Sequence, residues 1–132
     1  MTNLSVAERR DLACAWIELQ RAPQGSDAHA GLFWAHLKLD ELIQNNPNDA
    51  WLTILEIAML DDGKFNIENL GAGPLEDLLV YHGPETIAYI EAHVDDPRIR
   101  TLVQHVWKND MSDEIWVRLR SVAERATQGV RS

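Results

Sequence analysis

Cysteine is nearly missing from this chain of 132 residues, since Cys14 is the only one. A single thiol cannot form a disulfide within the chain, which is typical of proteins kept in a reducing compartment. Cys14 lies between Ala13 and Ala15 in an apolar segment, so we expect a buried and unreactive thiol. No base stands near it in sequence to activate it, and this argues against a catalytic cysteine.

Long apolar runs are missing as well. The most apolar stretch, residues 51–60, contains Glu56 and is far shorter than the roughly 20 residues that cross a bilayer. The first residues do not show a basic segment followed by an apolar one, so the sequence predicts no signal peptide. We therefore expect a cytoplasmic protein that does not bind membranes.

Basic residues are scarce in the middle of the chain. The net charge is −9, and residues 40–96 hold thirteen acids against one base, Lys64. Residues 1–39 carry four acids and four bases, whereas residues 97–132 carry four acids and seven bases. A stretch this acidic repels phosphate and argues against binding of nucleic acid. The sequence predicts a basic partner instead.

No segment alternates apolar and polar residues as a strand does, so the sequence predicts no β-sheet. Apolar residues recur at helical spacing. The pair Ser5 and Glu8 has the spacing of a capping box, which begins a helix that ends before Pro23. A second helix is expected over residues 28–44 and a third over residues 49–60, with Asn48 as its cap.

The third helix is apolar on most sides and should be central. Four more helix starts are expected, three of them with proline at the first helical position and the last with a serine cap. They stand at Gly73-Pro74, Gly83-Pro84, Asp96-Pro97 and Ser112.

These segments predict an all-α fold, a compact single-domain bundle of about seven or eight short helices packed as helical hairpins. The domain is expected to cover residues 1–132, with frayed ends at 1–4 and 128–132. Four of the five tryptophans, Trp16, Trp51, Trp107 and Trp116, lie on apolar stripes and are expected in the core. Trp34 lies opposite the stripe of its helix and is expected on the surface, where it suits a protein interface.

A signature stands at residues 70–83, which include Gly-Pro-Leu-Glu-Asp-Leu-Leu at 73–79 and His-Gly at 82–83. Together with residues 96–100, 106–107 and 112–116, it resembles an uncharacterised bacterial family of small helical proteins. The resemblance covers roughly residues 12–120, and its most characteristic region is about 70–107. It implies an all-helical fold and supplies no activity, cofactor or catalytic residue.

The signature has a structural interpretation and a functional one. In the first, Gly73 and Pro74 begin a helix, Glu76 faces its positive end, and Gly83 ends it in the left-handed conformation. In the second, acidic side chains and His82 hold a basic group or a metal. Glu76 and His82 are six residues apart, which puts them on different faces of a helix and weakens the metal interpretation.

Other acids and histidines give weaker signals. Residues 61–68 do not match a calcium loop and are interpreted as an acidic turn. The histidines form no metal-binding pair at helical spacing and are interpreted as packing or capping residues; they are His29, His36, His82, His93 and His105. Glu56 stands in an apolar helix, so we expect it either to reach solvent or to pair with Arg118 or Arg120.

The leading functional hypothesis is a non-enzymatic protein-binding module, of the kind found in immunity or antitoxin-like proteins that neutralise a basic toxin. No cofactor, metal or catalytic residue is predicted. The partner-binding candidates are Asp61, Asp62, Glu68, Glu76, Asp77, His82, Glu85, Glu91 and Trp34. Two alternatives stay open: a small hydrolase or metal-dependent enzyme that uses Glu76, Asp77, His82 and Glu85, and a homodimer that buries tryptophan.

Overall fold

The structure is a computed structural model that describes residues 3–60 and 67–129, with side chains up to residue 124. Every regular element in these ranges is helical, so the predicted all-α bundle is confirmed. The elements are α1 (Val6–Arg21), α2 (Asp27–Asn45), α3 (Pro47–Leu60), α4 (Ile67–Leu70), the π-helical turn η1 (Gly71–Leu75), α5 (Glu76–Tyr81), α6 (Gly83–Ala92), α7 (Pro97–Val103) and α8 (Asp113–Gly129).

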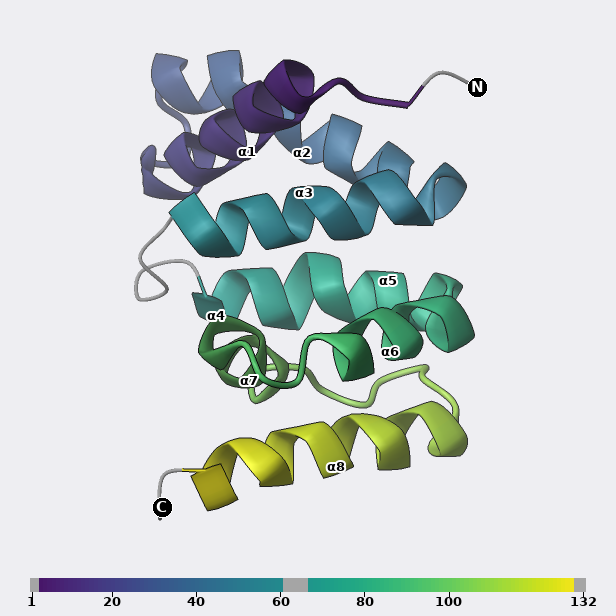
Figure 1. Ribbon diagram of the computed structural model, residues 1–132. Coiled ribbons are helices and arrows are strands. Elements are labelled where there is room, and N and C mark those ends of the chain that lie inside the picture. Colours follow the sequence, from purple (N-terminus) through teal and green to yellow (C-terminus); the bar gives the residue numbers. More distant parts are fainter. Residues whose placement is uncertain (1–2, 61–66, 130–132) are drawn as a thin grey trace.

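The helices form a stack with α1 and α2 at one end and α8 at the other (Figure 1). The third helix, α3, lies between the α1–α2 pair and the segments α4, η1, α5 and α7, and it contacts all of them. Its predicted central position is confirmed. Within the described residues, no helix combines the length and the apolar character needed to cross a bilayer.

The first three helices begin close to where the sequence predicts. Ser5 and Glu8 form the capping box of α1, and the Ser26 hydroxyl accepts the His29 backbone N–H at the start of α2. The third helix begins at Pro47, so the prediction that Asn48 caps it is wrong. Asn46 lies before it instead, and its side-chain oxygen accepts the Asp49 N–H at 3.4 Å.

The predicted helix start at Gly73-Pro74 is also wrong, because α4, η1 and α5 follow one another without a break. We call this continuous helical segment, residues 67–81, the signature rod (Figure 1). Pro74 lies inside it, where a proline lacks an N–H and its ring presses on the carbonyl four residues earlier. The π turn accommodates the proline by widening the helix locally: the Glu76 N–H reaches back to the Gly71 carbonyl, five residues away.

The later helices match their predicted starts. Pro84 stands in the first turn of α6, the Asp96 side chain accepts the Arg98 N–H at 2.9 Å, and the Ser112 hydroxyl accepts the Ile115 N–H. Gly83 is not the left-handed helix end that the sequence predicted. It is the first residue of α6, and it is packed against Ile115 of α8, where a Cβ would come within 3.1 Å.

The core confirms most of the predicted stripes. Leu75, Leu78 and Leu79 of the signature rod are fully buried. Trp16 and Trp51 are buried, and Trp116 is partly buried against the core, as predicted.

Three predictions about buried groups are wrong. Trp107 is 70% exposed because α7 ends at Val103, which leaves Trp107 in the following loop and off the helical stripe. Cys14 is exposed because it lies on the side of α1 away from Leu12 and Leu19. Glu56 is mostly covered, and its partner is Arg10 of α1, not an arginine of α8.

Of the ends predicted to fray, 1–4 and 128–132, residues 1–2 and 130–132 lie outside the described residues. Leu4, which is described, donates its backbone N–H to the buried Asp49 carboxylate at 3.0 Å. This bond joins the start of the chain to α3.

Gly71 marks the closest approach between the signature rod and α7. A Cβ at this position would lie 2.7 Å from the Leu102 carbonyl oxygen, so Gly71→Ala forces the two helices apart. We expect the free energy of unfolding in urea to fall by about 1–3 kcal/mol. Gly31→Ala is the control, since a Cβ at Gly31 meets nothing within 4 Å; equal stability of the two variants would contradict this packing.

Candidate functional site

The two acids of the signature, Glu76 and Asp77, point in different directions. Glu76 is only 6% exposed. One of its carboxylate oxygens accepts the Trp107 backbone N–H at 2.9 Å, and the other accepts the Asn109 side-chain amide. Asn109 has a φ of 41°, in the left-handed region that asparagine tolerates better than most residues. The Glu76 carboxylate therefore holds the loop between α7 and α8 in place.

Asp77 is exposed and faces away from that loop. It borders a hollow of about 200 Å³ between the signature rod and the α1–α2 pair. We call this cavity the acidic hollow. It is lined by Trp16, Gln20, His36, Leu39, Asp40, Ile43, Asn69, Gly73, Pro74 and Asp77.

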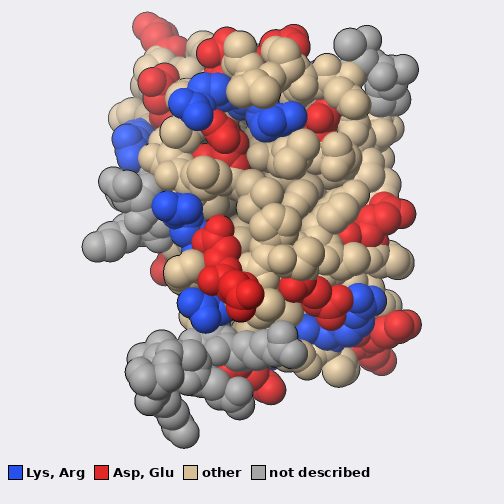
Figure 2. All heavy atoms as spheres, in the orientation of Figure 1, with Lys and Arg blue, Asp and Glu red and all other residues tan. Residues whose placement is uncertain are grey.

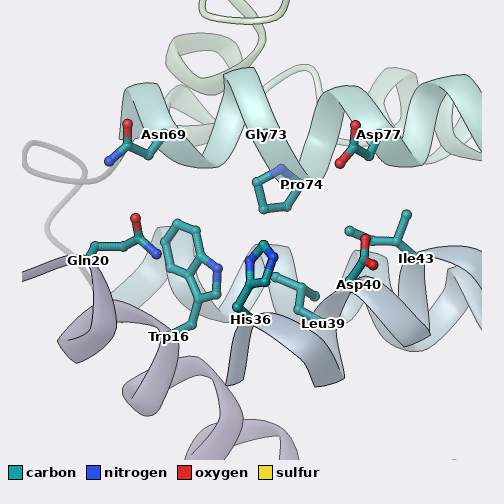
Figure 3. A pocket seen from close by; sticks show the side chains of 10 residues that line it. All are labelled: Trp16, Gln20, His36, Leu39, Asp40, Ile43, Asn69, Gly73, Pro74 and Asp77. Atoms are coloured by element: carbon teal, nitrogen blue, oxygen red, sulfur yellow. The ribbon is translucent and has the colours of Figure 1, made fainter. Parts of the chain in front are cut away.

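The polar groups of the acidic hollow are divided between two ends (Figure 3). Asp40 of α2 and Asp77 of the signature rod lie at one end, and the amides of Gln20 and Asn69 lie near Trp16 at the other. The ring of His36 stands below the ring of Pro74 between them. No lysine or arginine is among the described residues that line the cavity.

The hollow is electrostatically unfavourable for its own acids. Partial burial raises the pKa of Asp77, the negative charges of Asp40 and Glu76 raise it further, and His36 acts in the opposite direction. The Asp40 carboxylate accepts the Gln44 side-chain amide at 3.2 Å. Among the described residues, neither Asp40 nor Asp77 has a lysine or arginine partner, so the hollow favours a positively charged group.

An apolar surface borders the acidic hollow on α2. Phe33, Trp34 and Leu37 are all exposed, and Trp34 is 48% exposed, as the sequence predicted. The Phe33 ring lies 5.2 Å from the ring of His36, which lines the hollow. The Phe33 ring therefore joins this apolar surface to the edge of the hollow, while Trp34 lines a second cavity together with Lys38 and residues of α1.

The other predicted binding residues are dispersed. Asp61 and Asp62 lie outside the described residues, and Glu68 is exposed on α4. Glu91 pairs with Arg118 of α8. The prediction that Glu76 offers its charge to a partner is wrong, because that carboxylate is buried and holds the loop after α7.

His82 and Glu85 lie at the turn between α5 and α6. His82 contacts the Gln44 carbonyl oxygen through Nε2 at 3.2 Å, and its Nδ1 lies 3.6 Å from the Glu85 carboxylate. His82 thus connects this turn to the end of α2. Among the described residues, no group of three or more His, Cys, Asp or Glu side chains is placed to hold a metal ion.

Several other acids are paired with lysine or arginine within the protein. In the face seen in Figure 2, basic and acidic side chains often lie side by side, and the centre of the face is largely uncharged. Ion pairs of this kind join Arg10 to Glu56 and Arg118 to Glu91. Among the described residues, Asp40 and Asp77 of the acidic hollow have no such lysine or arginine partner.

Comparison with known protein families matches residues 22–127 to DUF6869, a family of unknown function. Because the match covers most of the chain, the protein belongs to this family. The matched range includes the signature rod and every residue that lines the acidic hollow except Trp16 and Gln20. No curated protein matches the chain, and no solved structure matches it.

The buried Glu76 gives a test of the loop contact. In Glu76→Gln, one acceptor oxygen becomes an NH₂ group that faces a donor, either the Trp107 N–H or the Asn109 amide. We expect the free energy of unfolding to fall by about 1–3 kcal/mol. The control Glu68→Gln alters an exposed acid, so a similar loss in both variants would show that Glu76 is no more than a surface charge.

The raised pKa of Asp77 predicts a pH-dependent stability. The folded protein binds the Asp77 proton more tightly than the unfolded chain, so the free energy of unfolding falls as pH rises from the ordinary value of 3.8 through the raised value. Asp77→Asn should therefore be more stable than the wild type at pH 7, and the advantage should disappear below about pH 3.

The control for this test is Asp95→Asn, which removes the same charge from an exposed turn that does not line the hollow. Thermal unfolding of the three proteins at both pH values measures the difference. An Asp77→Asn variant that is less stable than the wild type at pH 7 would overturn the electrostatic description of the hollow.

Proposed function

We propose that this protein is a non-enzymatic binding module that captures a basic protein segment on the outer face of α2. The acidic hollow is the observation that carries the proposal. Two carboxylates from different helices, Asp40 and Asp77, border one cavity without a lysine or arginine partner among the described residues. A cationic side chain from a partner would relieve the repulsion between them.

The apolar surface beside the hollow supports the same proposal. Phe33, Trp34 and Leu37 are exposed on consecutive turns of α2, and aromatic residues are frequent among those that carry binding energy at protein interfaces. Opposite charge would speed the encounter and fix the register, while burial of these apolar groups would supply most of the affinity.

A basic partner suits this surface better than a second copy of the chain. Each copy carries a net charge of −9, so two copies that meet at their acidic hollows would repel each other. In its most concrete form, the module is an immunity or antitoxin-like protein that neutralises a basic toxin. That form rests on small size and acidic charge alone.

Affinity capture from a lysate of the source cells tests this proposal with two matched baits. The first is Phe33→Ser/Leu37→Ser, and the second is Val6→Ser/Val117→Ser, which changes two exposed valines on α1 and α8. We expect basic proteins on the wild-type and the valine baits but not on the α2 bait. With the purified partner, each α2 substitution should weaken binding roughly tenfold, about 1.4 kcal/mol.

Two outcomes would refute the proposal. In the first, the three baits capture the same proteins. In the second, the proteins lost from the α2 bait are no more basic than those bound by an unrelated acidic domain. Sedimentation of the wild type at two concentrations tests the competing homodimer, and self-association that the α2 bait abolishes would favour a second copy instead.

A further inference from the structure

The acidic hollow contains a second polar group without a partner among the described residues, the indole N–H of Trp16. This side chain is only 3% exposed, yet it lines the cavity. Within the part of the chain that the structure describes, its N–H has no hydrogen-bond partner. Figure 3 shows the indole nitrogen on the side of the ring that faces His36, toward the interior of the hollow. The N–H opens onto the hollow, where solvent or a ligand oxygen can accept its hydrogen.

These polar groups require complementary features of one ligand. The carboxylates of Asp40 and Asp77 require a cationic donor, whereas the Trp16 indole can only donate and requires an acceptor oxygen. The amides of Gln20 and Asn69 lie at the same end as Trp16 and can each donate or accept (Figure 3). A ligand that fits both ends therefore carries a positive charge and, a few bonds away, a carbonyl or carboxylate oxygen.

We infer that the acidic hollow binds an arginine residue, with the guanidinium between Asp40 and Asp77 and a backbone carbonyl oxygen at the Trp16 indole N–H. The inference deepens the proposed function and rests on it for the source of the arginine, a segment of the partner. The same chemistry is present in free arginine, whose carboxylate would take the place of the carbonyl.

The dimensions and walls of the hollow favour a guanidinium over larger or more hydrated cations. Its volume of about 200 Å³ is below the roughly 300–1,000 Å³ of pockets that hold drug-sized ligands, so it suits one side chain. A guanidinium is planar, is more weakly hydrated than an ammonium, and packs on flat rings. The hollow offers two rings for such packing, those of His36 and Pro74. Its wall also includes the apolar side chains of Leu39 and Ile43.

Titration of the full-length ¹⁵N-labelled protein with N-acetyl-arginine amide tests this inference by NMR. We expect binding with a Kd on the order of millimolar and a shift of the Trp16 indole N–H signal, which Trp16→Phe assigns by its disappearance. N-acetyl-citrulline amide, neutral but similar in shape, should cause no shift. N-acetyl-lysine amide should bind several-fold more weakly, and free arginine shows whether a carboxylate replaces the carbonyl.

Asp40→Asn and Asp77→Asn should each weaken arginine binding at least tenfold, whereas Asp95→Asn should leave it unchanged. Both altered acids lie at least partly exposed on helix surfaces, so the variants should keep their folds, and the other tryptophan indole signals verify this. The inference fails if arginine and citrulline produce the same shifts, or if Asp40→Asn/Asp77→Asn binds arginine as the wild type does.

The outcomes for the hollow and for the proposed function are separable. In one outcome, the captured partner binds the Asp40→Asn/Asp77→Asn variant as well as the wild type but does not bind the Phe33→Ser/Leu37→Ser variant. The binding module then stands and the arginine site is refuted. If arginine binds as expected but the three baits capture the same proteins, the hollow is a site for free arginine and the proposed function is refuted.

Discussion

The widened helical turn at Pro74 determines how the two acids of the signature are used. Because η1 absorbs the proline, residues 67–81 continue as one rod and do not break into two helices. The direction of every side chain after Pro74 depends on this turn, since each residue added to a helical turn changes the direction of the following ones by roughly 100°. As a result Glu76 points inward and Asp77 points outward.

Those two directions connect distant parts of the chain. Glu76 binds the loop after α7 through Trp107 and Asn109, while Asp77 borders a cavity formed with α1 and α2. Gly71, in the same turn, allows α7 to approach the rod closely. One short segment thus organises the acidic hollow on one side and the C-terminal helices on the other, and burial of one carboxylate leaves its neighbour available to a ligand.

Much of the fold could be predicted from the sequence, because capping residues and apolar periodicity act locally. Ser5, Asp96 and Ser112 all stand at helix starts, and the apolar α3 is central as expected. The predictions are wrong where tertiary packing determines the local backbone structure. Pro74 has the sequence signature of a helix start, and only its accommodation in a π turn makes it an internal residue.

The site was harder to predict for the same reason. The sequence predicts Trp34 and Asp77 as surface groups, and both are exposed. Asp40, His36 and Trp16 were missed as members of one site because they come from two helices that meet the signature rod only in the folded protein. The spacing of residues 16, 40 and 77 in the sequence does not predict this contact. The sequence also does not show which acids are buried in the fold, as Asp49 and Glu76 are.

Amide hydrogen exchange at Trp107 tests most directly whether the turn at Pro74 directs Glu76 inward. This N–H lies in a loop outside the regular helices, and its acceptor is the Glu76 carboxylate. We therefore expect slow exchange at Trp107, similar to that of core helical amides. Exchange at the rate of an unstructured peptide would contradict the account, since it would mean that Glu76 does not reach the loop.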